Sequence, residues 1–268
     1  MAVSRRGYIF SVFLLSVLCV LLVVVAISSD SWVVSSATAE VQAADSSIRY
    51  GMFRGELLIY ELATPYVNTL YMTCIAELNA CAVSCKTDEE ARLIEVRALA
   101  QGFRPTANCL SETEVDESVI LPVPPVISFA FYVCLLLLLF LQLLFAVISA
   151  ALAIINATKN PTEPIFGLPG CLYSNVVTAV LGLTVLLLFG IYWSVSGLQD
   201  HLAISHIAIG LFVPGPGLGY SYWVLIAAVL CPIANVGLIK SRAYLLEKDP
   251  PPPTIKLENH SDGTIFLY

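Results

Sequence analysis

Cysteine thiols are the side chains of this sequence with the clearest potential for chemistry. Four of the eight cysteines lie in one acidic segment, and two kinds of site are open to them. The spacing of Cys81 and Cys85 occurs among zinc ligands, whereas four cysteines in an oxidising compartment form two disulfides, in one of three connectivities. No histidine accompanies them in residues 28–125, so disulfides are favoured. The disulfide candidates are Cys74, Cys81, Cys85 and Cys109.

Other patterns that carry chemistry are missing from the sequence. It contains no HExxH helix, no nucleophile elbow and no P-loop. The glycines of 214–219 precede an apolar segment and follow no strand-like one, so they are no dinucleotide fingerprint. The acidic run at 112–117 has the residue type that binds calcium, but such runs are usually solvated linkers. The sequence therefore predicts a protein that is no enzyme and has no cofactor, metal site or small-molecule substrate.

The composition is that of a membrane protein. Of 268 residues, 58% are hydrophobic and 12% are charged, and the mean hydropathy is +0.83, whereas soluble domains carry about 25% charged residues. The net charge of −7 is unevenly placed, because residues 29–125 hold 14 acidic and 6 basic side chains. A disordered chain or a basic nucleic-acid-binding surface would not have this composition. We expect a lipid bilayer around part of the chain and no nucleic-acid partner.

Four uncharged apolar segments reach or approach the roughly 20 residues that cross a bilayer as a helix. We expect an all-α transmembrane fold: a four-helix membrane bundle with a large, disulfide-braced extracellular loop after the first helix. The divisions are a cytoplasmic N-terminus at 1–6, helices at 7–27, 126–155, 171–195 and 222–239, outer loops at 28–125 and 196–221, a cytoplasmic loop at 156–170 and a cytoplasmic tail at 240–268. The second helix would be about 45 Å long, so it must tilt or project beyond the bilayer.

Basic residues set the expected orientation, since short loops rich in Lys and Arg stay cytoplasmic. Arg5 and Arg6 precede the first apolar segment, and Lys240 and Arg242 follow the last one. The loop at 196–221 holds neither Lys nor Arg. Both termini should therefore be cytoplasmic.

Two sequence patterns bear on this topology. The glycosylation sequences at 156–158 and 259–261 fall on the expected cytoplasmic side and should be unmodified. A cleavage-like motif at 26–28 makes a signal peptide the alternative for the first segment. Its apolar run is longer than a signal peptide requires, which favours a retained helix.

The large outer loop should hold secondary structure of its own. A capping box begins at Thr87 and ends at Glu90, which predicts a short helix over 91–100 with Thr87 as its N-cap. The apolar and aromatic stretches at 57–60 and 67–72 are suited to strands. We expect a small β-sheet and a short helix in this loop.

The apolar segments contain polar but no ionisable side chains, which argues against an ion-coupled transporter. Gln142 and Asn235 are expected to form hydrogen bonds between helices. Cysteines within the segments are expected to fill space in the packing, and Cys171 at a cytoplasmic helix end is a candidate for palmitoylation.

The cytoplasmic tail carries two recognisable features. The prolines of 250–253 favour a polyproline II rod, which serves best as a spacer. Phe266 and Tyr268 form an apolar-x-apolar terminus that could add a strand to a PDZ domain. A PDZ scaffold is therefore a candidate partner.

A large loop after the first helix and a short one later resemble the claudin-like group of four-helix membrane proteins. Within that group the sequence resembles the clarins. The first outer loop has an aromatic-Gly-apolar-Phe-x-Gly element, Gly, Pro and Leu-Tyr elements enter the third helix, and the chain ends in an apolar tail with a terminal Tyr. The residues that carry the motifs are Tyr50, Gly51, Phe53, Gly55, Pro164, Gly167, Pro169, Gly170 and Tyr173.

This resemblance implies a non-enzymatic organiser or adaptor of the plasma membrane. Clarin-like proteins are expected to act in the membranes, actin-rich protrusions or synapses of hair cells and photoreceptors, with actin-linked partners and self-association. Two alternatives stay open: an auxiliary subunit of an ion channel, and a claudin-type adhesion protein at cell junctions. The Trp-x-Gly-Leu-Trp-Cys-Cys signature of claudins is missing, which argues against a paracellular barrier.

Overall fold

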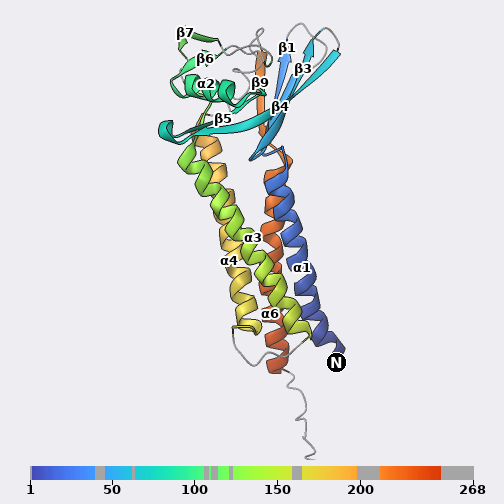
Figure 1. Cartoon of the computed structure of the whole chain (residues 1–268). Coiled ribbons are helices and arrows are strands. Elements are labelled where there is room, and N and C mark those ends of the chain that lie inside the picture. Colours follow the sequence, from blue (N-terminus) through green and yellow to red (C-terminus); the bar gives the residue numbers. More distant parts are fainter. Residues whose placement is uncertain are drawn as a thin grey trace, which may run out of the picture.

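The computed structural model consists of a bundle of long helices with a β-sheet domain at one end (Figure 1). We call this the outer domain, after its expected location. The structure describes residues 2–39, 46–61, 64–105, 109, 114–120, 123–158, 165–197 and 212–248.

Four helices are long and apolar enough to cross a membrane, as the sequence predicted. They are α1 (Ala2–Ser28), α3 (Phe129–Thr158), α4 (Leu168–Val195) and α6 (Tyr220–Lys248). Each helix packs against two others, in the cyclic order α1, α3, α4, α6. The predicted second helix starts at residue 129 rather than 126, because Ile127 and Ser128 form a strand instead.

One buried polar layer connects all four helices. Asn235 of α6 donates from Nδ2 to Ser16 Oγ of α1 (2.9 Å) and to Asn175 Oδ1 of α4 (2.8 Å). The Ser16 hydroxyl lies 3.4 Å from the hydroxyl of Ser149 on α3. We call these four residues the polar layer. They form the interhelical hydrogen bonding that the sequence predicted for Asn235.

A second polar side chain, Gln142, lies on α3 two helical turns from Ser149 of the polar layer, and it differs from that layer in its hydrogen bonding. Gln142 of α3 is fully buried, and neither of its amide atoms has a hydrogen-bond partner among the described residues. A Cβ at Gly182 of α4 would lie 2.5 Å from Gln142 Nε2, so glycine allows this close approach. The hydrogen bonds expected for Gln142 are therefore not found in the part of the chain that the structure describes.

The outer domain contains a seven-stranded antiparallel sheet in the order β8-β5-β4-β3-β2-β1-β9. Its strands are β1 (Val33–Ala39), β2 (Ser46–Tyr50), β3 (Arg54–Glu61), β4 (Thr64–Ile75), β5 (Ala80–Ser84), β8 (Ile127–Ser128) and β9 (Phe212–Leu218). The expected strands at 57–60 and 67–72 are confirmed as parts of β3 and β4. The sheet is larger than expected, and the fold is helical and β rather than all-α.

Strand β9 comes from the second outer loop, for which the sequence predicted no strand. It pairs with β1 over seven residues, from Val33 opposite Leu218 to Ala39 opposite Phe212. Since β1 follows α1 and β9 precedes α6, this pairing continues the packing of α1 on α6 into the outer domain.

Smaller elements complete the outer domain. A 3-10 turn, η1 (Ala76–Leu78), joins β4 to β5, and a short helix, α2 (Glu89–Ala100), packs on both of these strands. The short helix was predicted, but its N-cap is Asp88 rather than Thr87, because the Asp88 carboxylate accepts the Ala91 N–H (3.0 Å).

A two-stranded sheet forms the remainder of the outer domain. It pairs β6 (Phe103–Pro105) with β7 (Val115–Ile120). The acidic run at 112–117 therefore does not form a linker throughout, because its last three residues lie in β7.

Two disulfides brace this domain, as the sequence predicted. Cys74 pairs with Cys81 across the β4–β5 ladder, and Cys85 pairs with Cys109. The zinc alternative for Cys81 and Cys85 is excluded in this structure, since their sulfurs belong to different disulfides.

Candidate functional site

The helices α3 and α4 extend further into the outer domain than α1 does. Ser28 ends α1 twelve residues beyond Ser16 of the polar layer, and the position twelve residues from Ser149 on α3 is Leu137. Phe129, where α3 starts, lies eight residues further, which is about 12 Å at 1.5 Å per residue. The outer end of α3 therefore extends past the level where α1 ends, and it packs against the sheet (Figure 1). Whether it projects beyond the bilayer, as the sequence predicted, stays a prediction.

Hydrogen bonds fix the outer domain to these helix ends. The Asn79 carboxamide oxygen accepts the N–H of Ala130 (3.0 Å) and the hydroxyl of Ser128 (3.2 Å), so a residue from the β4–β5 turn caps α3. The Tyr132 hydroxyl donates to the carbonyl of Met52 (2.6 Å). Bonds of this kind, added to one continuous hydrophobic core, make the outer domain and the bundle one unit.

Aromatic side chains fill the junction between bundle and sheet. Trp32 is 1% exposed and donates from Nε1 to the carbonyl of Ala26 (2.7 Å). Its ring meets Phe189 edge-on (5.0 Å between centroids), and Phe131 stacks on Tyr192 (4.0 Å). Aromatic pairs in these geometries add to the stability gained from burial.

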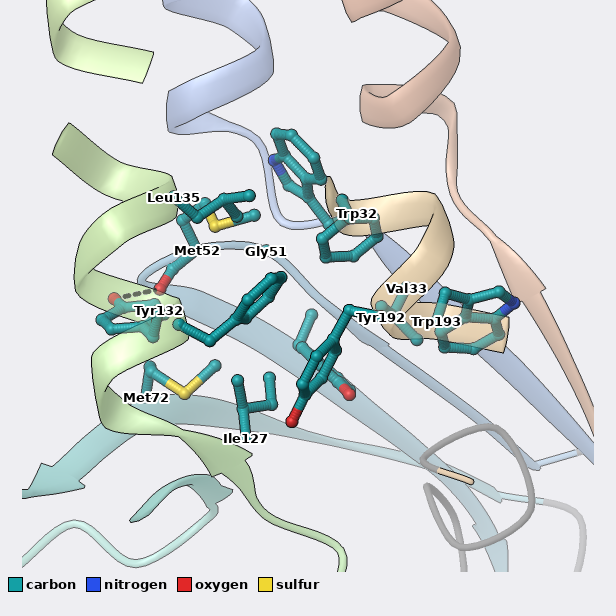
Figure 2. Close-up of a pocket in the computed structure, with 13 residues that line it drawn as sticks. Trp32, Val33, Gly51, Met52, Met72, Ile127, Tyr132, Leu135, Tyr192 and Trp193 are labelled. Carbon is teal, nitrogen blue, oxygen red and sulfur yellow. Dashed lines mark hydrogen bonds between the residues drawn. The ribbon is translucent and has the colours of Figure 1, made fainter. Parts of the chain in front are cut away.

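A hollow opens between these aromatic side chains (Figure 2). It holds about 430 Å³ of space free of atoms, including the part that opens outward, and its walls are almost wholly apolar. Figure 2 shows the walls converging from α3, α4 and the sheet, with the Tyr132 hydroxyl turned to the Met52 carbonyl. We call this space the junction hollow.

The first motif of the clarin resemblance lies at the same junction. Tyr50 is buried at the end of β2, and burial, with the nearby Tyr192 hydroxyl, raises the pKa of its phenol well above the usual value. A Cβ on Gly51 would lie 1.9 Å from the Ser29 carbonyl oxygen, and one on Gly55 would lie 2.4 Å from the Arg49 carbonyl oxygen. Both glycines are therefore required by close backbone approach. Phe53, in contrast, is 44% exposed.

The second motif shapes the turn that enters α4 at the opposite end of the bundle. Gly167 is the N-cap, Pro169 lies in the first turn, and a Cβ on Gly170 would lie 1.8 Å from the Ile165 carbonyl oxygen. Asn156 donates from Nδ2 to the carbonyl of Phe166 (2.8 Å). The atom that would carry a glycan at Asn156 is thus engaged in the turn. Tyr173 points outward, 69% exposed, and Pro164 lies outside the described residues.

Helix α2 is fixed to the sheet by polar contacts. The Ser84 hydroxyl donates to the carboxylate of Glu95, which is buried together with Lys86. Arg92 donates to the backbone carbonyl of Thr87 (2.8 Å), and its guanidinium lies 5.1 Å from the centre of the Tyr71 ring. These contacts fix α2 to strands β4 and β5 of the outer domain.

The strand edges of the sheet differ in what they offer a partner. At one end of the β1–β9 ladder, the Gly219 N–H donates to the Trp32 carbonyl (2.9 Å). Backbone N–H groups alternate in direction along a strand, so the backbone nitrogens of Pro214 and Pro216 lie on the side of β9 that faces away from β1. Proline has no N–H, so the outer edge of β9 is closed to another strand. The half of β4 before Tyr71 pairs only with β3 in the described ladders. We call 64–70 the β4 edge.

The β4 edge carries exposed apolar side chains. Tyr66 is 49% exposed and Val67 is 58% exposed, and Leu93 and Ile94 of α2 are also exposed. A strand whose second edge has no partner in the described ladders, beside exposed aromatic and aliphatic groups, is a candidate surface for binding a protein partner.

Two of the predicted sites, the Cys171 thiol and the apolar C-terminal pair, differ in what the structure describes of them. Cys171 is 1% exposed and accepts from Asn175 Nδ2 (3.7 Å), so its thiol is inaccessible in this conformation, which opposes palmitoylation. Phe266 and Tyr268 lie outside the described residues. In the part of the chain that the structure describes, no group of three or more His, Cys, Asp or Glu could hold a metal ion.

Comparison with models of protein families and with curated proteins gives no match for this chain. The junction hollow and the β4 edge were both missed by sequence reasoning. The walls of the hollow come from elements far apart in the chain. The β4 edge exists because the pairing of β4 with β5 stops at Tyr71, and the sequence does not show where that pairing stops.

Proposed function

We propose that this protein is a clarin-like organiser of the plasma membrane that binds partners through its outer domain and its cytoplasmic tail and catalyses no reaction. The outer domain faces the extracellular space, and both termini are cytoplasmic. Its sites of action are the membranes of sensory cells, at actin-rich protrusions or synapses.

The observation that carries this proposal is that hydrogen bonds and strand pairing hold the outer domain on the ends of the helices. The Asn79 cap and the Tyr132 bond to Met52 hold the sheet on α3, and the pairing of β9 with β1 ties it to α1 and α6. A domain held in this way presents a fixed surface at a constant height above the bilayer. That property suits a protein that positions partners laterally in a membrane.

Two further observations support binding. The β4 edge offers backbone groups and the exposed side chains of Tyr66 and Val67 to a partner strand. The basic residues Lys240 and Arg242 near the end of α6 support a cytoplasmic location for the tail. There, Phe266 and Tyr268 supply the apolar-x-apolar sequence for a PDZ scaffold that is linked to actin.

The location of the protein tests this proposal. An epitope placed between Lys159 and Pro161 leaves Tyr268 free, and the protein is then imaged when expressed from its own locus. Enrichment at protrusions or synapses of sensory cells is expected. A continuous belt at cell contacts would overturn the proposal in favour of adhesion, and co-purification with one channel as its constant partner would favour an auxiliary subunit.

The tail has a separate test. One glycine added after Tyr268 moves the terminal carboxylate and should abolish capture of a PDZ scaffold. Capture that is unchanged by this addition would refute the PDZ part of the proposal and leave the outer domain as the binding region.

A further inference from the structure

The Cys74–Cys81 disulfide closes the turn that carries the cap of α3. The two cysteines lie directly opposite each other on β4 and β5, with their Cα atoms 4.0 Å apart and a sequence separation of 7. The turn between them consists of η1 and Asn79. A change in this bond therefore acts first on the turn, and through Asn79 on the start of α3.

Asn79 bonds the turn to the start of α3. Its carboxamide oxygen accepts the Ala130 N–H (3.0 Å) and the Ser128 hydroxyl (3.2 Å), and its backbone carbonyl accepts the Phe129 N–H (3.2 Å). The backbone of Asn79 is left-handed (φ 49°), a region that residues other than glycine adopt at a cost. The bonds to α3 thus depend on a turn that is held in one conformation.

The disulfide is not needed to pair the two strands. Five residue pairs, that of the cysteines included, join β4 to β5 over 71–75. A disulfide that closes so short a loop also removes less entropy from the unfolded chain than the Cys85–Cys109 bond, whose sequence separation is 24. The distinctive effect of Cys74–Cys81 is therefore on the turn rather than on the sheet.

The two disulfides of the outer domain differ in their surroundings. Cys85 is 6% exposed within the main hydrophobic core, and Cys109 packs against that core. Neither Cys74 nor Cys81 belongs to a hydrophobic cluster of the described residues, and Cys74 is partly exposed. An attacking thiolate can reach Cys74 without entering the core, and exposed disulfides are the reducible ones.

We propose that the Cys74–Cys81 disulfide is a reversible reduction site that controls the attachment of the outer domain to α3, and that its reactant is an extracellular dithiol reductase. A thiolate of the reductase attacks the Cys74 sulfur, and the Cys81 sulfur leaves as a thiolate that takes up a proton. The second thiol of the reductase then displaces the Cys74 thiol, so the disulfide gains two electrons and two protons and the reductase is oxidised. The choice of reductase rests on the extracellular placement in the proposed function.

Reduction loosens the turn because two thiols need more room than a disulfide. Cys81 is fully buried and pairs with Ile127 of β8, so its sulfur has little room to move. The movement therefore falls on Cys74 and the turn, and Asn79 loses the geometry for its bonds to α3. The strand ladder and the second disulfide keep the sheet folded while its attachment weakens.

The first test asks which disulfide opens. The full chain in phosphatidylcholine nanodiscs is treated with a maleimide to block free thiols and then with increasing dithiothreitol. Thiols that dithiothreitol releases are trapped with an isotope-labelled maleimide and located by mass spectrometry. Cys74 and Cys81 should be trapped at concentrations that leave Cys85 paired with Cys109. Opening of Cys85–Cys109 first, or of both bonds together, overturns the proposal.

Hydrogen exchange then measures the attachment to α3. After selective reduction, amides in peptides that span 127–133 should exchange about fivefold faster, the factor that corresponds to the loss of one helix cap. The double substitution Cys74→Ser with Cys81→Ser should show the same rise without reductant. Unchanged exchange over 127–133 after selective reduction overturns the proposal, whether or not the double variant folds.

Two further variants show whether the bond acts through the cap. In Asn79→Gly the exchange over 127–133 should be fast before reduction, and reduction should add nothing. Cys85→Ser with Cys109→Ser is the matched control and should leave that exchange unchanged. A full further rise in Asn79→Gly, or an equal rise in the control, overturns the link between the bond and the cap.

The placement is tested apart from the bond. On intact cells treated with dithiothreitol, a maleimide that cannot cross membranes should label Cys74. Label that requires permeabilised cells overturns the extracellular placement and the choice of reductase, and it leaves the link between bond and cap in the purified protein standing.

Discussion

At the scale of single residues, this protein depends on a few positions where a side chain or its absence joins distant segments. Asn79 lies in the left-handed region (φ 49°) at a tight turn and also caps a helix that starts fifty residues later. Gly51 allows the β2–β3 turn to meet the end of α1. Neither role is local, so neither follows from the neighbouring sequence.

Removing the cap should loosen the outer end of α3. Asn79→Gly keeps the left-handed backbone but loses the carboxamide oxygen, and we expect a loss of about 1 kcal/mol in the free energy of unfolding. Asn79→Asp is the matched control, since it keeps an oxygen acceptor and tolerates this backbone region. Thermal unfolding in detergent compares the two. Equal losses in both variants would show that the cap contributes nothing.

The close approach at Gly51 gives a sharper prediction. Gly51→Ala places a Cβ 1.9 Å from the Ser29 carbonyl oxygen, so the junction must shift, at a cost of about 3 kcal/mol. Gly237→Ala in α6 is the control, because its Cβ meets nothing within 4 Å and alanine favours the helix. The control should be neutral or stabilising in the same melting experiment. A melt of Gly51→Ala at the wild-type temperature would contradict the described junction.

At the scale of elements, the polar layer and Gln142 contribute with opposite signs to the stability of the helix bundle. Asn235 is bonded to two other helices, whereas Gln142 is buried with both amide atoms unpartnered among the described residues. A buried polar group lowers stability unless it is bonded. The polar layer therefore fixes the register of the helices, and Gln142 weakens the packing around it.

Substitution by leucine at these two positions should change stability with opposite signs. Asn235→Leu loses the bonds to Ser16 and Asn175, and we expect a loss of about 1 kcal/mol. Gln142→Leu removes the unpartnered amide at similar volume and should be neutral or stabilising. Resistance to unfolding by a denaturing detergent measures both. A large loss from Gln142→Leu would mean that a water or another group bonds the amide.

The long helices were predictable because runs of about 20 apolar residues have few other uses. The four loop cysteines were predicted to pair, but the connectivity could not be, since it depends on the register that places Cys74 opposite Cys81. Strand β9 was not predictable, because a segment with two prolines and two glycines lacks strand propensity and is held by pairing with β1. Ile127 and Ser128 look like the start of a helix by hydropathy, and only their pairing with β5 makes them a strand.

At the scale of the whole molecule, the outer domain and the bundle share one core, while their surfaces differ in composition. The helices expose leucine, isoleucine and phenylalanine along their length, as lipid contact requires. The outer domain instead carries most of the acidic residues and an ion pair between Arg49 and Glu56 on adjacent strands. These surfaces support an outer membrane boundary near the end of α1 and the start of α6.

Glycosylation should report on which side of the membrane the sheet lies. Val67→Asn creates an acceptor sequence with Thr69 on an exposed position of β4. A glycan at this position is expected in mammalian cells, seen as a mass shift that an amidase removes. The native sequences at 156–158 and 259–261 are the internal controls and should remain unmodified. A glycan at Asn259 without one at the introduced site would invert the proposed orientation.

The pairing of β9 with β1 also has a consequence for synthesis. The β1 strand leaves the ribosome long before its partner, since 173 residues separate Ala39 from Phe212. At 5–20 residues per second this delay is roughly 10 to 30 s. During that time the edge of β1 that later pairs with β9 lacks its partner strand, and an uncovered strand edge is prone to aggregate. The sheet is thus completed by the last strand to be made, and chains truncated before residue 212 should aggregate more readily than the full chain.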